Sequence, residues 1–504
     1  MKLFKLMEDV SFTSNLPLEE INEIEIKDIA YNSRNCEDGF MFVALVGETV
    51  DGHKFVRNAY DNGARIFLLQ SGMESDKNVM GLPEDAVKIF VDDTRISLSR
   101  VSHNFFNKPS ESLKIVGVTG TKGKTTITNY IATVLNEAGI NTGVIGTNGT
   151  FFNGTYEVTA NTTPESYELH RIFRKMLDNG VKCVSMEVSS GGIMQNRVED
   201  VDFDVAIFSN LSPDHIGPKE HPTFEHYLQC KARLFKMAKH GIINIDDKYA
   251  KDIIDAATCN IETFAIENNA DLTADNIVYS KEIDSLGVSF ECNTKEEKFP
   301  CYICSPGTFS IYNALAVIAV CKYLGVKREI MVDALKNAKV NGRVEVLPIL
   351  PYATIVVDYA HNGVSLENIL QTLKNYDHNR LICLFGSVGG RTEIRRKELG
   401  DVAARECDVA ILTADNPDFE DPMNVIDDIA KSFEGSSCEV IKISDREEAV
   451  KYAVKNAKEG DMIVFAGKGH EKYQLINGQK LPFDEIAIAK EEAKKVLEEK
   501  SLLA

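Results

Sequence analysis

One short string constrains the fold of this chain more than any other: residues 119–126 read TGTKGKTT. An apolar run, Lys114–Val118, precedes the string, and apolar residues at helical spacing follow it. A buried strand, a glycine-rich turn and a helix start are therefore predicted in this order. Such a unit is typical of a mostly parallel sheet covered by helices, so the string predicts an α/β fold.

The same string predicts a site for nucleotide phosphates. Backbone N–H groups of the turn and the helix N-terminus would point at phosphate oxygens. Lys124 can reach the β- and γ-phosphates, and the Thr125 hydroxyl can bind Mg²⁺. Val118 stands where the usual pattern has a glycine. A plain glycine turn would explain Gly120 and Gly123, but not a Gly-Lys-Thr at the helix start. ATP is therefore the predicted ligand, with eight expected contacts: Thr119, Gly120, Thr121, Lys122, Gly123, Lys124, Thr125 and Thr126.

The chain is too long for one hydrophobic core, and its 504 residues divide into three predicted domains. We expect a small α/β domain over 1–110, a central domain of P-loop ATPase type over 111–340, and a Rossmann-like domain over 341–504. The predicted class is α/β, with mostly parallel sheets.

The pattern also predicts individual elements. Strands are expected at the short apolar runs Gly39–Leu45, Ala64–Leu69, Ile115–Val118, Thr142–Gly146, Cys183–Val188, Val205–Ser209, Thr354–Val357, Leu381–Phe385, Val409–Leu412, Val440–Ile443 and Met462–Phe465. Helices are expected at Phe55–Asn62, Thr125–Ala138, Glu165–Leu177 and Tyr312–Leu324. Residues 262–302 are expected to be a strand-rich decoration.

Composition argues against several partners and sites. The formal net charge is −20, whereas nucleic acids and anionic membranes require a basic face, so neither is expected as a partner. No apolar stretch approaches the roughly 20 residues of a membrane span, and the start MKLFKLMEDV lacks a secretion signal. Eleven scattered cysteines favour reduced thiols in the cytoplasm. Cys301 and Cys304 form a lone C-x-x-C pair, for which a structural zinc is not favoured.

Two positions after predicted strands suit a metal bound to phosphates. Glu187 lies at the end of one strand, and Asp214-His215 follows another. Ligands of parallel sheets bind at the carboxyl ends of the strands, so these side chains can converge on the phosphate loop. A carboxylate and an imidazole facing a triphosphate are suitable ligands for Mg²⁺. The alternative is a turn cap and a loop hydrogen bond.

Six strings, the phosphate loop among them, together carry a resemblance to a known family: GTKGKTT (120–126), MEVSSGG (186–192), SNLSPDHIGP (209–218), DYAHN (358–362), TADNP (413–417) and GKGHEKYQ (467–474). They resemble the Mur ligase family, and within it the MurE branch of UDP-N-acetylmuramyl-tripeptide synthetases. Residues 32–55 resemble the uridine-nucleotide domain of that branch. The ordered set touches all three predicted domains.

The resemblance implies that the chain adds a free amino acid to the D-glutamate of UDP-MurNAc-L-Ala-D-Glu with ATP. ATP would phosphorylate the carboxylate, since an acyl phosphate reacts with amines and a carboxylate does not. Catalysis would consist mainly of positioning and of neutralising phosphoryl charge. We expect the enzyme to be a monomer.

By motif position, the resemblance implies four catalytic residues: Lys124, Glu187, His215 and Lys231. Lys231 matches the lysine that this family carbamylates with CO₂, and the carbamate would bind a second Mg²⁺. The implied metal ligands are thus Thr125, Glu187, His215 and the Lys231 carbamate. From composition alone, Lys231 would be an ordinary lysine on a helix surface.

Further implied ATP contacts are Asn313, Arg343 and Asp358. The implied contacts to the UDP-linked dipeptide are Ser33, Asn161, Thr162, Thr163, Ser189, Gln195 and Arg197. Those to the amino acid are Arg391, Asp415, Asn416, Asp418, Gly467 and Glu471. Arg197 has a clear physical role, since a guanidinium suits a carboxylate or pyrophosphate.

The sequence gives conflicting indications about which amino acid is added. Family members that add meso-diaminopimelate carry Asp-Asn-Pro-Arg, whose arginine meets the distal carboxylate. Here Asp418 follows Asp415-Asn416-Pro417, and its charge would favour a distal ammonium. The string GKGHE (467–471), by contrast, is typical of diaminopimelate enzymes. The prediction is an amino-ended substrate such as L-lysine, with meso-diaminopimelate as the alternative.

Two other functions stay open from the residues alone. A folylpolyglutamate-type amide ligase would share the loop and the Asp-His motif, but residues 32–55 argue against it. A non-catalytic nucleotide sensor would not need the combination of Lys124, Glu187, His215 and Lys231.

Overall fold

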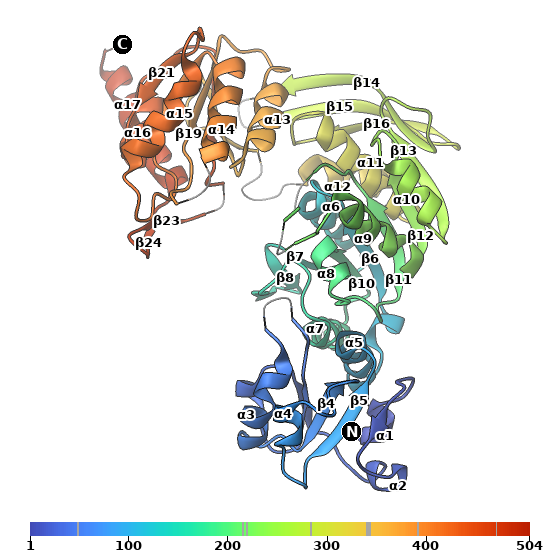
Figure 1. The fold of residues 1–504 in the computed structure, drawn as a ribbon. Helices are drawn as coiled ribbons and strands as arrows, with labels where there is room; N and C mark the ends of the chain where they lie inside the picture. Colours follow the sequence, from blue (N-terminus) through green and yellow to red (C-terminus); the bar gives the residue numbers. More distant parts are fainter. Residues whose placement is uncertain are drawn as a thin grey trace. The chain divides into compact units, whose positions relative to one another are not determined.

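The computed structural model describes residues 1–47, 50–213, 216–217, 220–282, 285–338, 344–390, 393–469 and 471–503 (Figure 1). The chain divides into two compact units. The first unit comprises Met1–Thr273 with Tyr312–Ala334, and the second comprises Ala274–Ile311 with Leu335–Ala504. Both are built from largely parallel sheets covered by helices, which confirms the predicted α/β class. The three domain boundaries stay a prediction.

The N-terminal part of the first unit is a five-stranded sheet in the order β1-β5-β4-β3-β2. Its strands are β1 Thr13–Ser14, β2 Asp28–Ala30, β3 Phe40–Val43, β4 Ile66–Gln70 and β5 Val87–Val91. All neighbours pair in parallel except β1, which is antiparallel to β5. Apolar residues of α1 Leu3–Leu6, α2 Leu18–Ile21 and α5 Thr94–Phe105 pack on one face. Those of α3 Val56–Asp61 and α4 Lys77–Met80 pack on the other.

The central sheet has eleven strands in the order β16-β15-β14-β13-β12-β11-β6-β10-β7-β8-β9. They are β6 Lys114–Thr119, β7 Thr142–Gly146, β8 Gly149–Phe152, β9 Thr155–Glu157, β10 Cys183–Glu187, β11 Phe203–Phe208, β12 Ala238–Asn244, β13 Asn260–Ala265, β14 Leu272–Lys281, β15 Leu286–Asn293 and β16 Lys298–Ile303. The strands from β7 through β10, β6, β11 and β12 to β13 run parallel. The strand-rich character expected for residues 262–302 is confirmed, but their strands β13 to β16 extend the central sheet and are not a separate decoration.

The helices associated with this sheet are α6 Lys124–Glu137, α7 Ser166–Asp178, α8 Ser190–Met194, α9 Phe224–Met237, α10 Ala250–Ala256, α11 Thr308–Tyr323 and α12 Arg328–Asn337. Helix α6 begins at the predicted glycine turn, and its buried residues recur at helical spacing from Ile127 to Leu135. The chain passes from β6 through α6 to β7 on one side, while β11 lies on the other side of β6. Strand β6 thus marks a switch in strand order, where α/β sheets bind ligands at the carboxyl edge.

The main sheet of the second unit has the order β17-β18-β22-β19-β20-β21. Its strands are β17 Glu345–Leu347, β18 Thr354–Asp358, β19 Arg380–Phe385, β20 Val409–Leu412, β21 Glu439–Lys442 and β22 Asp461–Ala466. Neighbours pair in parallel except β17, which is antiparallel to β18. A separate hairpin pairs β23 Tyr473–Ile476 with β24 Gln479–Pro482.

Alternating residues of β18 face two cores, as in a sheet covered on both sides: Val356 joins one core, and Ile355 and Val357 join the other. Helices α13 Gly363–Leu373, α14 Glu393–Glu406 and α15 Pro422–Ala430 contribute to the first core. Helices α16 Arg446–Lys455 and α17 Glu485–Leu503 contribute to the second and lie together at one side of this sheet (Figure 1).

In the described part of the chain, no helix is both long enough and apolar enough to cross a membrane.

Candidate active site

The phosphate loop joins β6 to α6 through two glycines with positive φ angles. Gly120 has φ +151°, and a Cβ there would lie 2.0 Å from Ser209 Oγ. Gly123 has φ +88°, and a Cβ there would lie 2.8 Å from Asn313 Oδ1. Any larger residue would clash at either position, so the loop requires glycine. Asn313, a predicted ATP contact, thereby lies against the loop.

Polar contacts anchor the loop to the segment after β11. Thr121 N donates to Asn210 O at 2.9 Å, and Lys122 N donates to Asn210 Oδ1 at 2.9 Å. The Thr121 hydroxyl oxygen lies 3.2 Å from the Tyr227 hydroxyl and accepts from Ser212 N at 3.0 Å. Thr126 lies in the first turn of α6. The loop is therefore held in shape by its neighbours, which is the preorganisation that phosphate binding requires.

Two lysine ammonium groups converge on one carbonyl oxygen of this loop. Lys124 Nζ donates to Gly120 O at 2.9 Å, and Lys231 Nζ donates to the same oxygen at 3.0 Å. Lys231 is 1% exposed and its Nζ lies 4.5 Å from the centre of the Tyr227 ring. The expectation from composition, a lysine on a helix surface, is thus corrected: Lys231 projects from α9 into the protein, toward the phosphate loop.

Glu187 links the loop to its neighbouring strand. Its carboxylate accepts from the Thr125 hydroxyl at 3.0 Å and from Thr147 N at 2.9 Å. Gly146 leaves the space for it, since a Cβ there would lie 2.3 Å from Glu187 Oε1. A carboxylate beside a threonine hydroxyl is an oxygen donor pair that suits Mg²⁺, so these residues fit the predicted metal.

Three predicted site residues lie outside the described residues: His215, Arg343 and Arg391. Their predicted roles stay predictions.

Five of the predicted substrate residues of the first unit form a connected polar group around Arg197: Thr162, Thr163, Ser189, Gln195 and Arg197 itself. Arg197 Nη1 donates to Thr163 O at 3.0 Å, and Nη2 donates to Gln195 Oε1 at 2.6 Å. Glu165 Oε2 lies 3.5 Å from both Arg197 Nε and Arg95 Nη1. Burial lowers the pKa of the Arg197 guanidinium from its usual value, yet the group stays protonated near neutral pH. The sequence patterns had not pointed to Arg95 and Glu165.

The same group extends along the β10 end. The Thr163 hydroxyl donates to Glu187 O at 3.0 Å and lies 3.0 Å from Ser189 Oγ, which caps α8. Thr162 Oγ1 lies 3.0 Å from Thr147 Oγ1, beside the Glu187 carboxylate. Thr162, Thr163 and Ser189 therefore lie next to Glu187, one of the predicted metal ligands.

Two other predicted substrate residues lie apart from this network. Asn161 is exposed. Ser33 begins a short 3-10 helix after β2, and its carbonyl accepts from Asn62 Nδ2 at 2.8 Å. Glu165 and Arg197 both act electrostatically on Tyr31, whose pKa is raised to about 12 mainly by burial. Tyr31, the residue after β2, therefore lies within electrostatic range of Glu165 and Arg197.

In the second unit, the buried residue Lys468 connects the predicted amino-acid contacts. Its Nζ donates to Asn416 Oδ1 at 2.6 Å and lies 3.2 Å from Asp415 Oδ1 and 3.3 Å from Glu471 Oε2. Tyr359 donates to Glu471 Oε1 at 3.3 Å. Lys468 is the second residue of the string GKGHE (467–471), of which only Gly467 and Glu471 are predicted site residues. The string therefore indicates the place of Lys468, although the resemblance gives it no role.

Asp418 is bound within the fold. It has φ +52°, its carboxylate accepts from Gly478 N at 2.7 Å, and it forms a backbone bridge to Ile476. Asp418 therefore stabilises the β23–β24 hairpin.

The carboxylate of Asp358, a predicted ATP contact, is also hydrogen-bonded within the protein: it accepts from Val344 N at 2.9 Å and from Ala360 N at 2.8 Å.

Gly467 has φ +109° and follows β22. A Cβ at Gly467 would lie 3.6 Å from Asp415 Oδ2.

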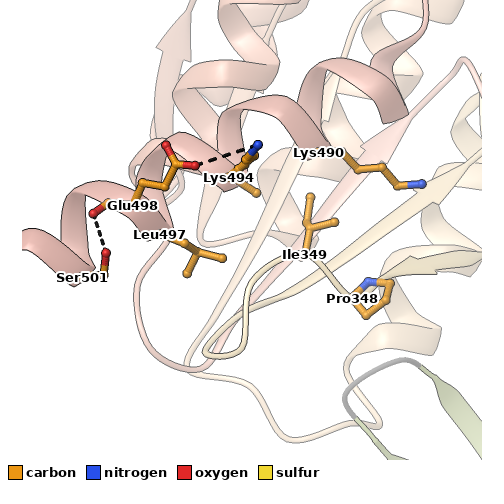
Figure 2. Close-up of a pocket in the computed structure, with 8 residues that line it drawn as sticks. Pro348, Ile349, Lys490, Lys494, Leu497, Glu498 and Ser501 are labelled. Atoms are coloured by element: carbon orange, nitrogen blue, oxygen red, sulfur yellow. Dashed lines mark hydrogen bonds and ion pairs between the residues drawn. The ribbon is translucent and has the colours of Figure 1, made fainter.

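Figure 2 shows a different feature of the second unit, a shallow hollow beside α17. Its lining contains none of the predicted site residues: Pro348, Ile349, Lys490, Ala493, Lys494, Leu497, Glu498 and Ser501. The chemistry predicted from the sequence therefore does not belong to this hollow.

Three family models match successive parts of this chain. Residues 25–106 match the family model described as Mur ligase family, catalytic domain. Residues 118–321 match the Mur ligase middle domain, and residues 342–469 match the Mur ligase, glutamate ligase domain.

Individual relatives cover nearly the whole chain. The UDP-N-acetylmuramoyl-L-alanyl-D-glutamate--2,6-diaminopimelate ligase of Caldanaerobacter subterraneus subsp. tengcongensis is 37% identical over 93% of this chain and 95% of its own length. The ligase of the same name from Clostridium perfringens is 39% identical over 92% and 94%. A solved structure of a ligase with this name has 30% identity and a TM-score of 0.71, covering 94% of this chain and 95% of its own.

The phosphate loop at a switch in a parallel sheet, with two lysines and a carboxylate around it, defines a nucleotide-dependent α/β enzyme. The chain belongs to the Mur ligase family, and it is an ATP-dependent amide ligase. All three relatives are named for 2,6-diaminopimelate, so the lysine prediction is not supported and its alternative fits better.

Proposed function

We propose that this enzyme joins an amine of meso-diaminopimelate to the D-glutamate carboxylate of UDP-N-acetylmuramoyl-L-alanyl-D-glutamate, with conversion of ATP to ADP and phosphate. The observation that carries the proposal is the convergence of Lys124, Lys231 and Glu187 on one phosphate loop, next to the Arg197 group. The names of the relatives support the identity of both substrates.

The first step would transfer the γ-phosphoryl group to the D-glutamate carboxylate. The loop N–H groups and Lys124 would bind the phosphate oxygens and offset the charge that spreads over them. Glu187 and Thr125 would hold Mg²⁺, which neutralises phosphate charge when bound. Asn313 lies against Gly123, in a position to contact the nucleotide.

In the second step, the amine of the amino acid attacks the acyl phosphate carbon. The C–N bond forms, the C–O bond to phosphate breaks, and the amine loses a proton. The residues that contact Lys468 would bind the amino acid. The carboxylate and amide oxygens of Asp415, Asn416 and Glu471 could accept hydrogen bonds from the ammonium groups of the amino acid. Arg391 would meet a carboxylate, by its place in the motif.

Lys231 would carry a carbamate. In that modification the Lys231 amine attacks CO₂, a C–N bond forms and one proton is released. Two ammonium groups share the Gly120 carbonyl in the unmodified chain, and like charges at this separation repel. A carbamate would replace that pair of cations by an ion pair and would provide an anionic oxygen ligand for a second Mg²⁺.

The UDP-linked dipeptide would bind along the first unit. Arg197, held by Thr163, Gln195 and Glu165, would orient an anionic group of the dipeptide. Tyr31 and Ser33, at the carboxyl end of β2, would contribute to the uridine-nucleotide side. A cytoplasmic monomer stays the predicted state of the enzyme.

The test is incubation of the full chain with UDP-MurNAc-L-Ala-D-Glu, Mg·ATP and, separately, meso-diaminopimelate, L-lysine or L-ornithine. Mass spectrometry of the nucleotide product and ADP release are measured together. We expect tripeptide and stoichiometric ADP with meso-diaminopimelate. Tripeptide from lysine alone would overturn the amino-acid assignment, and no tripeptide with any of the three would overturn the function.

A further inference from the structure

Three metal-ligating side chains of the first unit gather away from the predicted Mg²⁺ ligands. They are His221, His226 and Cys230, and their donor atoms all lie within 4.8 Å of one another. His226 and Cys230 are four residues apart on α9, so they share a helix face. His221 comes from the segment that leads into this helix and is 2% exposed, while the other two are half-buried.

The separations are close to those of a metal centre. His221 Nδ1 lies 2.9 Å from His226 Nδ1, and Cys230 Sγ lies 3.9 Å from His226 Nδ1. With Zn–N bonds of ~2.0–2.1 Å and Zn–S bonds of ~2.3 Å, tetrahedral donors are about 3.3–3.6 Å apart. The separations of 2.9 and 3.9 Å lie on either side of these values, and all three donors lie within 4.8 Å of one another, so the adjustment that binding requires is a rotation of side chains.

The donor set selects the metal. Two imidazoles and a thiolate suit Zn²⁺ and related late divalent ions, whereas Mg²⁺ requires oxygen ligands. The predicted Mg²⁺ ligands Glu187 and Thr125 supply oxygen instead. The cluster is therefore chemically distinct from the ATP-dependent centre.

We propose that His221, His226 and Cys230 form a Zn²⁺ site with three protein ligands and a fourth position open to water. In the metal-free chain, one imidazole Nδ1–H donates to the other Nδ1. On binding, that imidazole proton moves to its Nε2, the Cys230 thiol loses its proton to solvent, and Zn²⁺ takes the vacated lone pairs. The charge and the proton count balance with no redox change.

The site adjoins the phosphate loop through one aromatic residue. The His221 ring centre lies 5.0 Å from that of Tyr227, and the Tyr227 hydroxyl lies 3.2 Å from Thr121 Oγ1. A bound ion would thus fix the segment before α9 next to the loop.

The experiment uses the full chain, freed of metals and kept reduced, titrated with Co²⁺ as a spectroscopic substitute for Zn²⁺. We expect one equivalent to produce tetrahedral visible absorption and a near-ultraviolet thiolate-to-cobalt charge-transfer band, both removed by Zn²⁺ and not by excess Mg²⁺. An oxygen-ligated site cannot produce the charge-transfer band, so the predicted Mg²⁺ centre does not interfere.

Variants locate the signal. Cys230→Ser should abolish the charge-transfer band, and His226→Ala should weaken Zn²⁺ binding by at least about 10-fold. Cys259→Ser is the matched control, since Cys259 is another half-buried cysteine of the same unit, and it should keep the band. Absence of the band in the parent chain would overturn the proposal. A charge-transfer band that persists in both Cys230→Ser and His226→Ala would also overturn the proposal. Using two variants keeps the test valid if one of them fails to fold.

Discussion

At the scale of single residues, Lys231 has a buried ammonium group that shares the Gly120 carbonyl with Lys124. Its position on a helix does not indicate this burial, because α9 also carries Lys236, five residues after Lys231, and Lys236 is exposed. Burial beside another cation is costly for an unmodified lysine, which gives the proposed carbamate a physical reason.

We predict that Lys231→Arg lowers the ligase kcat by about 10²–10³, because arginine keeps the cation but cannot carry a carbamate. Excess bicarbonate should not restore the rate. Labelled ¹³CO₂ should give a carbamate signal by NMR in the parent chain and in the control Lys236→Arg, and none in Lys231→Arg. Turnover near the parent rate in Lys231→Arg would refute the carbamate.

Glu187→Gln should raise the Mg²⁺ concentration needed for half-maximal activity by about 10- to 100-fold. The amide can still accept from Thr125 and Thr147, so the loop should keep its shape while the charge on the metal ligand is lost. A Mg²⁺ titration of steady-state rates measures the shift. Glu225→Gln, at an exposed position on α9, is the control and should leave the titration unchanged.

At the scale of elements, the β23–β24 hairpin explains why the charge of Asp418 is a poor guide to which amino acid the enzyme adds. The carboxylate accepts from Gly478 N, so the group predicted to face a substrate is used in a contact with a residue sixty positions later in the chain. Its φ of +52° suits aspartate or asparagine better than most side chains.

Asp418→Asn should change kcat/KM for meso-diaminopimelate by less than about threefold, since asparagine tolerates the same backbone and still accepts a hydrogen bond. Asp418→Ala should lower the free energy of unfolding by about 1–2 kcal/mol, through backbone strain and the lost hydrogen bond. Kinetics and denaturant unfolding measure the two effects. An increase of about 10-fold or more in kcat/KM for meso-diaminopimelate in Asp418→Asn would show that the Asp418 charge repels the distal carboxylate of this substrate.

The loop after β22 carries the second element-scale prediction. Lys468 has no exposed surface and faces Asp415 and Glu471. Lys468→Met should destabilise the second unit by about 3–5 kcal/mol, because it leaves carboxylates without their cation. It should also raise KM for the amino acid.

The matched control is Lys472→Met, which removes an exposed lysine whose side chain is 78% accessible. Its ion pair with Asp484 is worth only about 0–1 kcal/mol. Equal unfolding midpoints for the two variants would contradict the structural role of Lys468.

At the scale of the whole molecule, the first unit joins its N-terminal sheet to its central sheet through α5 and α7. His103 of α5 and His170 of α7 lie with ring centres 5.0 Å apart. Neither ring nitrogen of His170 has a hydrogen-bond partner among the described residues. Burial lowers the pKa of His170 well below its usual value and also lowers the pKa of His103, against the opposing charges of Asp200 and Glu111.

These shifts predict acid sensitivity. Above pH ~6.5 both folded and unfolded states leave His170 neutral, so it contributes no pH dependence. Below that pH the unfolded chain binds a proton that the folded chain does not, and the free energy of unfolding falls by about 1.4 kcal/mol per pH unit for this residue. His170→Leu should flatten the decline of the unfolding midpoint between pH 7 and pH 5. An unchanged slope would refute the assignment.

The sequence by itself determined many of the buried strands and several of the helices. Expected strands such as Thr142–Gly146 and the helix after Gly123 agree with the structure to within a residue or two, because local apolar periodicity specifies them. It also determined the phosphate loop, since the positive φ angles of Gly120 and Gly123 are a local requirement that glycine meets.

Only the tertiary structure decided which side chains meet. The burial of Lys231, the central place of Lys468, the hairpin contact of Asp418 and the grouping of His221 with Cys230 all join positions whose local patterns do not indicate the partner. The physical reason is that periodicity records which face of an element is apolar, whereas the partner across a loop or sheet depends on the packing of elements distant in sequence.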